Sequence, residues 1–315
     1  MKSLPIALAL LLAPYSAAAA QTPNPGCTSR PEGAAPLFLG VTTQIVGITC
    51  PAPEGNFVST AHVIRVDLSV PGLSFEASSA PSVGSFSPTL TTTFLATTRS
   101  QIAINANLFI VCCTDTPPPE GTTTALQGLE ISNGKVLSPF RNNPKDGTQP
   151  YPFATSLIVA ANGLRIVTPT EPPAAATAVT GSHILVSGRQ NVAPTNSSSS
   201  DSFFGPNPRT LAGLSADNKV LWLAAVDRLS ENSGVTLPQA AQFMIQLGAA
   251  TALNFDGGGS TSLAVQMPDG VPGLLNFPSD QNSGCSFTKG GRCERYVGAS
   301  FGIHAQPLLR APSGH

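Results

Sequence analysis

The stretch TLPQAAQFMIQLGAATALNFDGGGSTSL, residues 236–263, carries the signals that decide the fold. Thr236 is a favourable N-cap, a proline follows in the first turn, and Gln239 stands at the capping-box position. Apolar residues recur on one face until Gly248, which is typical of a helix C-cap. The next apolar run, residues 251–255, predicts a strand. The stretch therefore predicts a helix that leads directly into a strand.

Another strand is predicted just before this helix, over residues 220–226. The order strand, helix, strand predicts a right-handed βαβ crossover between parallel strands. Asp227 follows the first strand and Asp256 follows the second. If the strands are near neighbours, both carboxylates lie at one edge of the sheet, where proteins with parallel sheets bind ligands. This edge is therefore the predicted site.

The rest of the chain predicts many short strands and hairpins. Residues 41–49 and 62–70 show β-branched alternation, and Asn-Gly turns at 133–134 and 162–163 indicate hairpins. Residues 88–98 have helical spacing, with Ser87 as a candidate cap. The chain contains 29 glycines and 30 prolines, which favours a loop-rich fold over a helical bundle. We expect an α+β (mixed α/β) fold, with a mixed β-sheet and packed helices.

Composition excludes several functional classes. The net charge of −1 gives no basic footprint for nucleic acid. Hydrophobic residues make up 41% of the chain, which is enough for a core, although only 10% of residues are charged. No stretch is long and apolar enough to predict a membrane span.

Residues 1–20 have the pattern of a signal peptide. Lys2 is followed by the short apolar run 5–12 and by small residues before Gln21. The alternative, a membrane anchor, is disfavoured because the apolar run is short and Pro14 follows it. We therefore expect an exported protein, periplasmic or secreted, with residues 21–58 as an N-terminal extension.

Six cysteines agree with export to an oxidising compartment. None has zinc-ligand spacing. Cys285 and Cys293 bracket a loop and are the easiest pair to bridge, followed by Cys27 with Cys50. The remaining pair, at 112 and 113, is adjacent and leaves the connectivity open.

The segment from Asp256 to Ser260 combines a carboxylate, three glycines and a hydroxyl. Glycines let the backbone approach a ligand closely, and successive N–H groups can form an anion site. The lysine of a P-loop is missing. The alternative interpretation is a tight turn with a capping aspartate.

Four other polar residues are candidates, each with a structural alternative. Asp227 either serves the site or forms a surface pair with Arg228. Arg209 has a guanidinium that suits phosphate, or it is a solvated surface residue. Asn105 and Asn107 share one face of a strand and either serve the site or form a structural hydrogen-bond network.

Five segments, spread in order from about residue 60 to 305, resemble those of the phosphodiester glycosidase domain family. The segment of residues 247–262, LGAATALNFDGGGSTS, is similar to the family signature LGAxxALNLDGGGST and is the most specific of them. The others are IAINANLF at 102–109, NPRTLAGL at 207–214, AAVD at 224–227 with SGVTL at 233–237, and RYVGASFGI at 295–303.

The resemblance implies a domain over residues 59–306, a tail over 307–315, and cleavage of a sugar-1-phosphodiester. It makes Asp256 and Asp227 candidates for base, nucleophile or stabiliser of positive charge at the sugar C1 atom. Their separation would indicate retention or inversion. The implied substrate- and phosphate-binding residues are Arg209, Thr210, Asn105, Asn107, Asn254, Ser233, Gly234, Gly257, Gly258, Gly259 and Ser260.

The sequence departs from the family pattern at four points, one of which is the long, Ser-rich linker of residues 191–204. Arg228 follows Asp227 where the family usually has glycine, Leu108 replaces an aromatic residue, and His183 stands where proline is common. These departures bear on the substrate more than on the fold. We expect an exported hydrolase that acts on a sugar phosphodiester or polysaccharide of the envelope or extracellular space.

Two other functions compete with this one. Asp227 and Asp256 are hard ligands that suit Ca²⁺ or Mg²⁺ in a metal-dependent phosphodiesterase. A non-catalytic glycan- or phosphoglycan-binding envelope protein is the second, although aromatic content is only 6%. A Ser-His-Asp hydrolase lacks its motifs, and His304 is interpreted as structural. The sequence leaves the sugar and the oligomeric state open.

Overall fold

The structure is a computed structural model that describes residues 26–51, 56–110, 122–139, 154–195, 203–228, 234–279, 286–287 and 293–308. The predicted signal peptide, Ser233 and Cys285 lie outside these residues. Within the described part of the chain, no helix is both long and apolar enough for a membrane crossing.

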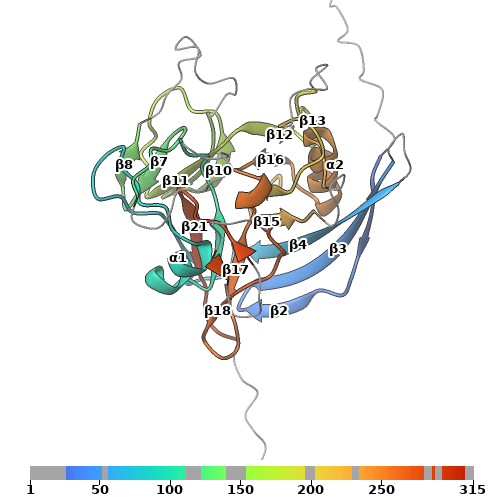
Figure 1. Cartoon of the computed structure of the whole chain (residues 1–315), viewed down its shortest axis with the longest axis horizontal. Coiled ribbons are helices and arrows are strands. Elements are labelled where there is room, and N and C mark those ends of the chain that lie inside the picture. The colour runs from blue at the N-terminus through green and yellow to red at the C-terminus, as the bar shows by residue number, and fades with distance from the viewer. Residues whose placement is uncertain are drawn as a thin grey trace, which may run out of the picture.

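The largest sheet has nine strands in the order β1-β3-β4-β15-β14-β16-β12-β13, with β2 also paired to β3. In Figure 1, β3 and β4 are long and curve along one side of the molecule. The predicted N-terminal extension contributes three of these strands. The bounds are β1 Thr28–Pro31, β2 Ala35–Phe38, β3 Val41–Cys50, β4 Phe57–Asp67, β12 His183–Ser187, β13 Gln190–Asn191, β14 Arg209–Leu214, β15 Val220–Val226 and β16 Thr251–Asn254.

Two five-stranded sheets and one short ribbon complete the strands. One sheet has the order β10-β9-β11-β7-β8, and the other has the order β18-β17-β6-β21-β5. The bounds are β5 Ser74–Ala77, β6 Ile102–Asn105, β7 Glu130–Ser132, β8 Lys135–Ser138, β9 Thr155–Ala160, β10 Gly163–Val167, β11 Thr177–Gly181, β17 Leu263–Gln266, β18 Pro272–Leu274, β19 Ser286–Phe287, β20 Cys293–Glu294 and β21 Ser300–His304.

The prediction of parallel strands is wrong. Every strand pairing in the described residues is antiparallel, and β14 lies between β15 and β16, antiparallel to both. The sheets are therefore antiparallel and not mixed, and no βαβ unit pairs these two strands directly. Two antiparallel steps nevertheless leave β15 and β16 running in the same direction, so their carboxyl ends still lie at one edge.

Helix α2, Leu237–Leu247, follows its sequence signals closely. Thr236 accepts a hydrogen bond from the Gln239 amide, Gln239 Oε1 accepts one from the Thr236 amide, and Gly248 ends the helix with φ 105°. Helix α1, Thr91–Thr98, begins later than predicted. Its cap is Glu294, whose carboxylate accepts from the Thr92 amide at 3.0 Å. Local sequence cannot show this cap because the two residues are 202 positions apart.

The nine-stranded sheet separates two apolar clusters. Its inner face packs on the other two sheets through residues such as Ile64, Leu223 and Phe301. Its outer face packs on α2, which lies beside β12 and β13 (Figure 1). The disulfide between Cys27 and Cys50 belongs to the same outer cluster, which confirms that predicted pair. Cys293 is also in a disulfide, but the predicted partner Cys285 is outside the described residues.

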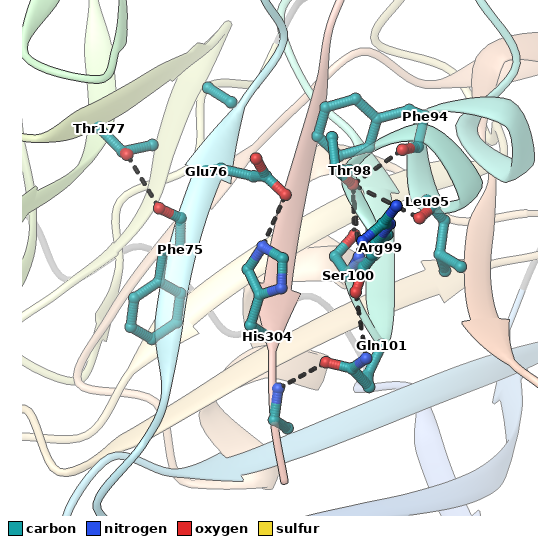
Figure 2. A network of polar contacts seen from close by, with 12 residues as sticks. Phe75, Glu76, Phe94, Leu95, Thr98, Arg99, Ser100, Gln101, Thr177 and His304 are labelled. Atoms are coloured by element: carbon teal, nitrogen blue, oxygen red, sulfur yellow. Dashed lines mark hydrogen bonds and ion pairs between the residues drawn. The ribbon is translucent and has the colours of Figure 1, made fainter.

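His304 has the structural role that we expected. Its Nε2 atom lies 2.7 Å from Glu76 Oε1 on the neighbouring strand β5, as Figure 2 shows. Gln101 in the same view accepts a hydrogen bond from the Ala305 amide at 2.9 Å. These contacts fasten the end of β21 within its sheet.

Glu130 on β7 is an isolated acid in the interior. It is 0% exposed, and neither carboxylate oxygen has a hydrogen-bond partner among the described residues. Burial raises the pKa of this carboxyl well above 4.5. Burial therefore favours the neutral form of Glu130 in the native state.

We expect the substitution Glu130→Leu to stabilise the protein by about 1–3 kcal/mol at pH 8. The folded pKa of Glu130 lies above the unfolded value, so stability is lost as pH rises above 4.5. Urea unfolding at pH 8 and pH 4 measures the gain, which should shrink at pH 4. The exposed Glu32→Leu is the control. A variant less stable than wild type at pH 8 would contradict this account.

Candidate active site

Three predicted residues meet at one edge of the nine-stranded sheet. Arg209 begins β14 and pairs in register with Val226, so it lies beside the end of β15, where Asp227 follows. Leu211 pairs with Asn254 at the end of β16, just before Asp256. The sheet topology thus places Asp227 and Asp256 at one edge as predicted, although through an antiparallel arrangement, and it adds Arg209 to them.

The glycine loop forms a short 3-10 turn, η2, Gly258–Ser260. The Gly258 amide donates to Pro208 O at 2.9 Å, and a Cβ atom on Gly257 would lie 2.7 Å from the same oxygen. Glycine is therefore required where the loop meets the segment before β14. The amide of Ser260 also bonds within the loop, to Gly257 O at 3.2 Å. The loop therefore does not present the full row of free amides that its sequence predicted.

Asp256 is the most perturbed acid of the site. Its side chain is buried at 3% exposure, and burial raises its pKa from 3.8 to about 7. The nearby Ser260 hydroxyl, the charge of Arg295 and the Gly257 amide oppose this rise. Ser260 is close, yet Asp256 Oδ2 has no properly aligned hydrogen-bond partner among the described residues. Asp256 can therefore gain or lose a proton near neutral pH.

Several residues close to Asp256 in the sequence have buried polar atoms without a hydrogen-bond partner. Within the described residues, Asn254 Oδ1, Ser260 Oγ and Thr261 Oγ1 are buried and lack hydrogen-bond partners, as Asp256 Oδ2 does. Buried polar atoms without partners are rare in native proteins, because each one costs desolvation free energy. Hydroxyl and carbonyl groups of this kind suit a ligand rich in hydroxyl or phosphate oxygens.

Asp227 is buried at 1% exposure but fully engaged, unlike Asp256. Its Oδ1 atom accepts from Asn276 Nδ2 at 2.9 Å, and its Oδ2 atom accepts from the Phe277 amide at 2.8 Å. His62 Nε2 lies 3.2 Å from the same Oδ2 atom, although it is not aligned as a hydrogen bond. The alternative of an exposed surface pair with Arg228 is therefore wrong.

Asn276 links Asp227 to the glycine loop. Its amide also donates to Thr261 O at 3.0 Å, and its Oδ1 atom accepts from the Leu263 amide at 2.8 Å. Neither Asn276 nor His62 was a sequence-based candidate. No local signal marks Asn276, since it acts on Asp227 from 49 residues away.

The two predicted asparagines brace the scaffold. Asn105 donates to Asp256 O at 2.7 Å and accepts from Thr210 Oγ1 at 2.8 Å, so the Thr210 hydroxyl is also engaged. Asn107 donates to Leu129 O at 3.1 Å and accepts from the Thr180 amide at 2.8 Å. These contacts correspond to the structural network that was the alternative for both asparagines.

Arg209 is buried and is not a solvated surface residue. Its guanidinium donates to the backbone oxygens of Val235, Phe203 and Gly205 at 3.0, 2.7 and 2.8 Å. No carboxylate contacts it among the described residues. Burial lowers its pKa to about 9, and burial together with this charge lowers the pKa of His183 to about 4. Arg209 therefore fastens two loops and leaves positive charge near the site.

Gly234 also has a structural position. Its φ of 111° and the closeness of Asn207, 2.5 Å from a Cβ atom, require glycine there. Ser59 Oγ accepts from its amide at 2.8 Å.

Arg295 is the main residue that sequence reasoning missed as a site residue. A Cβ atom on Gly259 would lie 2.6 Å from Arg295 Nη2, so the guanidinium lies directly on the glycine loop. Its positive charge also lowers the pKa of Asp256. An arginine within the closing RYVGASFGI segment of a chain with few charges was the signal that could have identified it.

The described residues bear on the predicted Ca²⁺ or Mg²⁺ site in two ways. Each oxygen of Asp227 accepts one hydrogen bond, from Asn276 or from the Phe277 amide, and each keeps a further lone pair. No group of three His, Cys, Asp or Glu side chains within the described residues has metal-site geometry. The Ca²⁺ or Mg²⁺ alternative stays a prediction that needs a direct test.

Three comparisons place the chain among known proteins. A structure of the zebrafish N-acetylglucosamine-1-phosphodiester alpha-N-acetylglucosaminidase catalytic domain, auto-inhibited by its pro-peptide, matches with TM-score 0.59 and 18% identity, over 89% of each chain. A hypothetical protein from Synechocystis matches with TM-score 0.52 and 16% identity, over 85% of this chain and 62% of that one. A Burkholderia pseudomallei protein matches with TM-score 0.54 and 12% identity, over 89% of this chain and 97% of that one.

At these identities the solved structures show a shared fold. A search of curated proteins found no match. The model of the phosphodiester glycosidase family matches residues 98–304, which is more than half of the chain. The chain therefore belongs to the phosphodiester glycosidase family, whose domain is a glycosidase that acts on phosphodiester linkages.

Proposed function

We propose that the protein is an exported hydrolase that cleaves the linkage between a sugar C1 atom and a phosphodiester in envelope or extracellular polysaccharide. The observation that carries the proposal is Asp256, a buried acid with a pKa of about 7 and an unpaired oxygen beside a glycine loop. Family membership supports the linkage, and the predicted signal peptide supports the location.

The charge and the hydrogen-bonding groups of each site residue indicate which part of the substrate it would contact. Arg295 and the Ser260 and Thr261 hydroxyls would bind the phosphate, because they lie on or beside the loop and the guanidinium suits phosphate oxygens. Arg209 would add positive potential near the phosphate, while its Nε and Nη2 atoms stay bonded to three backbone oxygens. Asn254 would contact a sugar hydroxyl.

Asp256 would act as the general base. A phosphate whose charge is compensated leaves without a proton, so the carboxylate is free to activate water. The water oxygen bonds to C1, its proton passes to Asp256, and the C1–O electron pair leaves on the phosphate oxygen. Asp227 would position Asn276 and Phe277 rather than react, because its two oxygens hold the Asn276 side chain and the Phe277 amide.

The test is a panel of hexose 1-(methyl phosphate) diesters, assayed for release of free sugar and methyl phosphate. We expect turnover of at least one member, and unchanged turnover after dialysis against EDTA. Loss of activity with EDTA and recovery with Mg²⁺ or Ca²⁺ would favour the metal-dependent alternative. Saturable binding without turnover would instead favour a glycan-binding protein.

A further inference from the structure

Phe277 is an exposed aromatic residue attached to the candidate site. Its side chain is 54% exposed, and it is the only aromatic among the large exposed hydrophobic residues of the described chain. The residues on either side, Asn276 and Pro278, are buried. The backbone therefore presents this one ring to solvent between two buried residues.

The position of Phe277 is fixed by the site itself. Its amide donates to Asp227 Oδ2 at 2.8 Å, and Asn276 joins Asp227 Oδ1 to the backbone of Thr261. The His62 ring lies 6.4 Å away, inclined at 53°. The same hydrogen bonds thus hold the backbone from which the ring projects and the segment that follows the glycine loop.

The chemistry of the ring limits what it can bind. Phenylalanine offers a flat apolar face and no hydrogen-bonding group, so it contributes by packing against another flat apolar surface. A pyranose ring has such a surface in its C–H face, whereas its hydroxyls point outward toward polar partners. The unpaired Oδ1 atom of Asn254 is a polar partner of that kind.

We propose that Phe277 stacks on the sugar ring of the substrate and determines specificity for the sugar half. This inference rests on the proposed function for the position of the substrate. Phe277 would contribute to binding equally in the ground state and the transition state, because it lies beside Asp227 and not at the acid Asp256.

The test compares Phe277→Ala, Phe277→Leu and Phe277→Trp on the diester that wild type cleaves best. We expect KM to rise about tenfold in the Ala and Leu variants, with kcat within about twofold, while Trp keeps the wild-type KM. Inhibition by the methyl glycoside should weaken in the Ala variant, whereas inhibition by methyl phosphate should not. The control is Val271→Ala, an aliphatic residue that is 39% exposed.

The outcomes separate this inference from the proposed function. An unchanged KM in an active Phe277→Ala enzyme overturns the stacking role and leaves the hydrolase intact. If wild type cleaves no diester, the proposed function fails, and Phe277 is tested by NMR titration with hexose 1-phosphates. Weaker binding to Phe277→Ala would then support stacking, and equal binding or no binding would overturn it.

Discussion

Replacing Asp256 with asparagine is expected to lower kcat/KM by about 10³-fold while leaving the fold intact. Asparagine keeps the shape of the side chain but cannot accept a proton from water. Steady-state kinetics on the best diester measure the loss, with melting temperature as the check on folding. Asp217→Asn, on the exposed hairpin between β14 and β15, is the matched control and should keep full activity. An active Asp256→Asn enzyme would remove Asp256 from the reaction.

The pH dependence of wild type and of Asp256→Asn gives a second test of the role of Asp256. Because burial raises the pKa of Asp256 to about 7, wild-type kcat/KM should rise with pH through about 7. The ionised form is also the less stable one, since the unfolded carboxyl ionises near 3.8. Stability is therefore lost as pH rises from about 4 to 7, by roughly 4 kcal/mol at most. Asp256→Asn should melt higher than wild type at pH 8, and the gain should vanish near pH 4.

The substitution Arg209→Leu is expected to cost about 3–5 kcal/mol of unfolding free energy, because backbone oxygens of Val235, Phe203 and Gly205 lose their donor. Urea unfolding measures the cost. The exposed Arg65→Leu is the control and should change stability by no more than about 0.5 kcal/mol. Wild-type stability in Arg209→Leu would show that these three contacts contribute little.

Arg209→Leu should also reduce activity in the molecules that remain folded. The adjacent Pro208 oxygen holds the Gly258 amide at 2.9 Å, so displacement of this segment moves the glycine loop. A fall in kcat measured well below the unfolding midpoint distinguishes this effect from simple unfolding. Full kcat under those conditions would indicate that the loop keeps its position without Arg209.

Local signals were sufficient where the partners are close in sequence. Thr236, Gln239 and Gly248 specify both ends of helix α2 within a short stretch of sequence, and the structure follows them. The predicted βαβ crossover was wrong, because the order strand, helix, strand in the sequence does not reveal that β14 lies between β15 and β16. The prediction that both strands end at one edge of the sheet was still correct. The reason is that β15 and β16 are each antiparallel to β14 and therefore run in the same direction.

Contacts between residues far apart in the sequence explain why the sequence alone could not distinguish the two aspartates. Asp227 and Asp256 have the same local setting, each at the end of an apolar strand. They differ because Asn276 and Phe277, about 50 residues further on, occupy both oxygens of Asp227. Arg295 was similarly hidden, since its contact with Gly259 follows from the packing of the closing segment.

The adjacent residues Glu294 and Arg295 have a consequence for the order of synthesis. Glu294 caps α1 from 202 positions away, and Arg295 lies against the glycine loop. A nascent chain that ends before residue 294 lacks both the carboxylate that caps α1 and the guanidinium at the glycine loop, even if its sheets have already formed. Catalytic competence therefore arises only after residues 294 and 295 have been made, and forms truncated before residue 294 should be inactive rather than partly active.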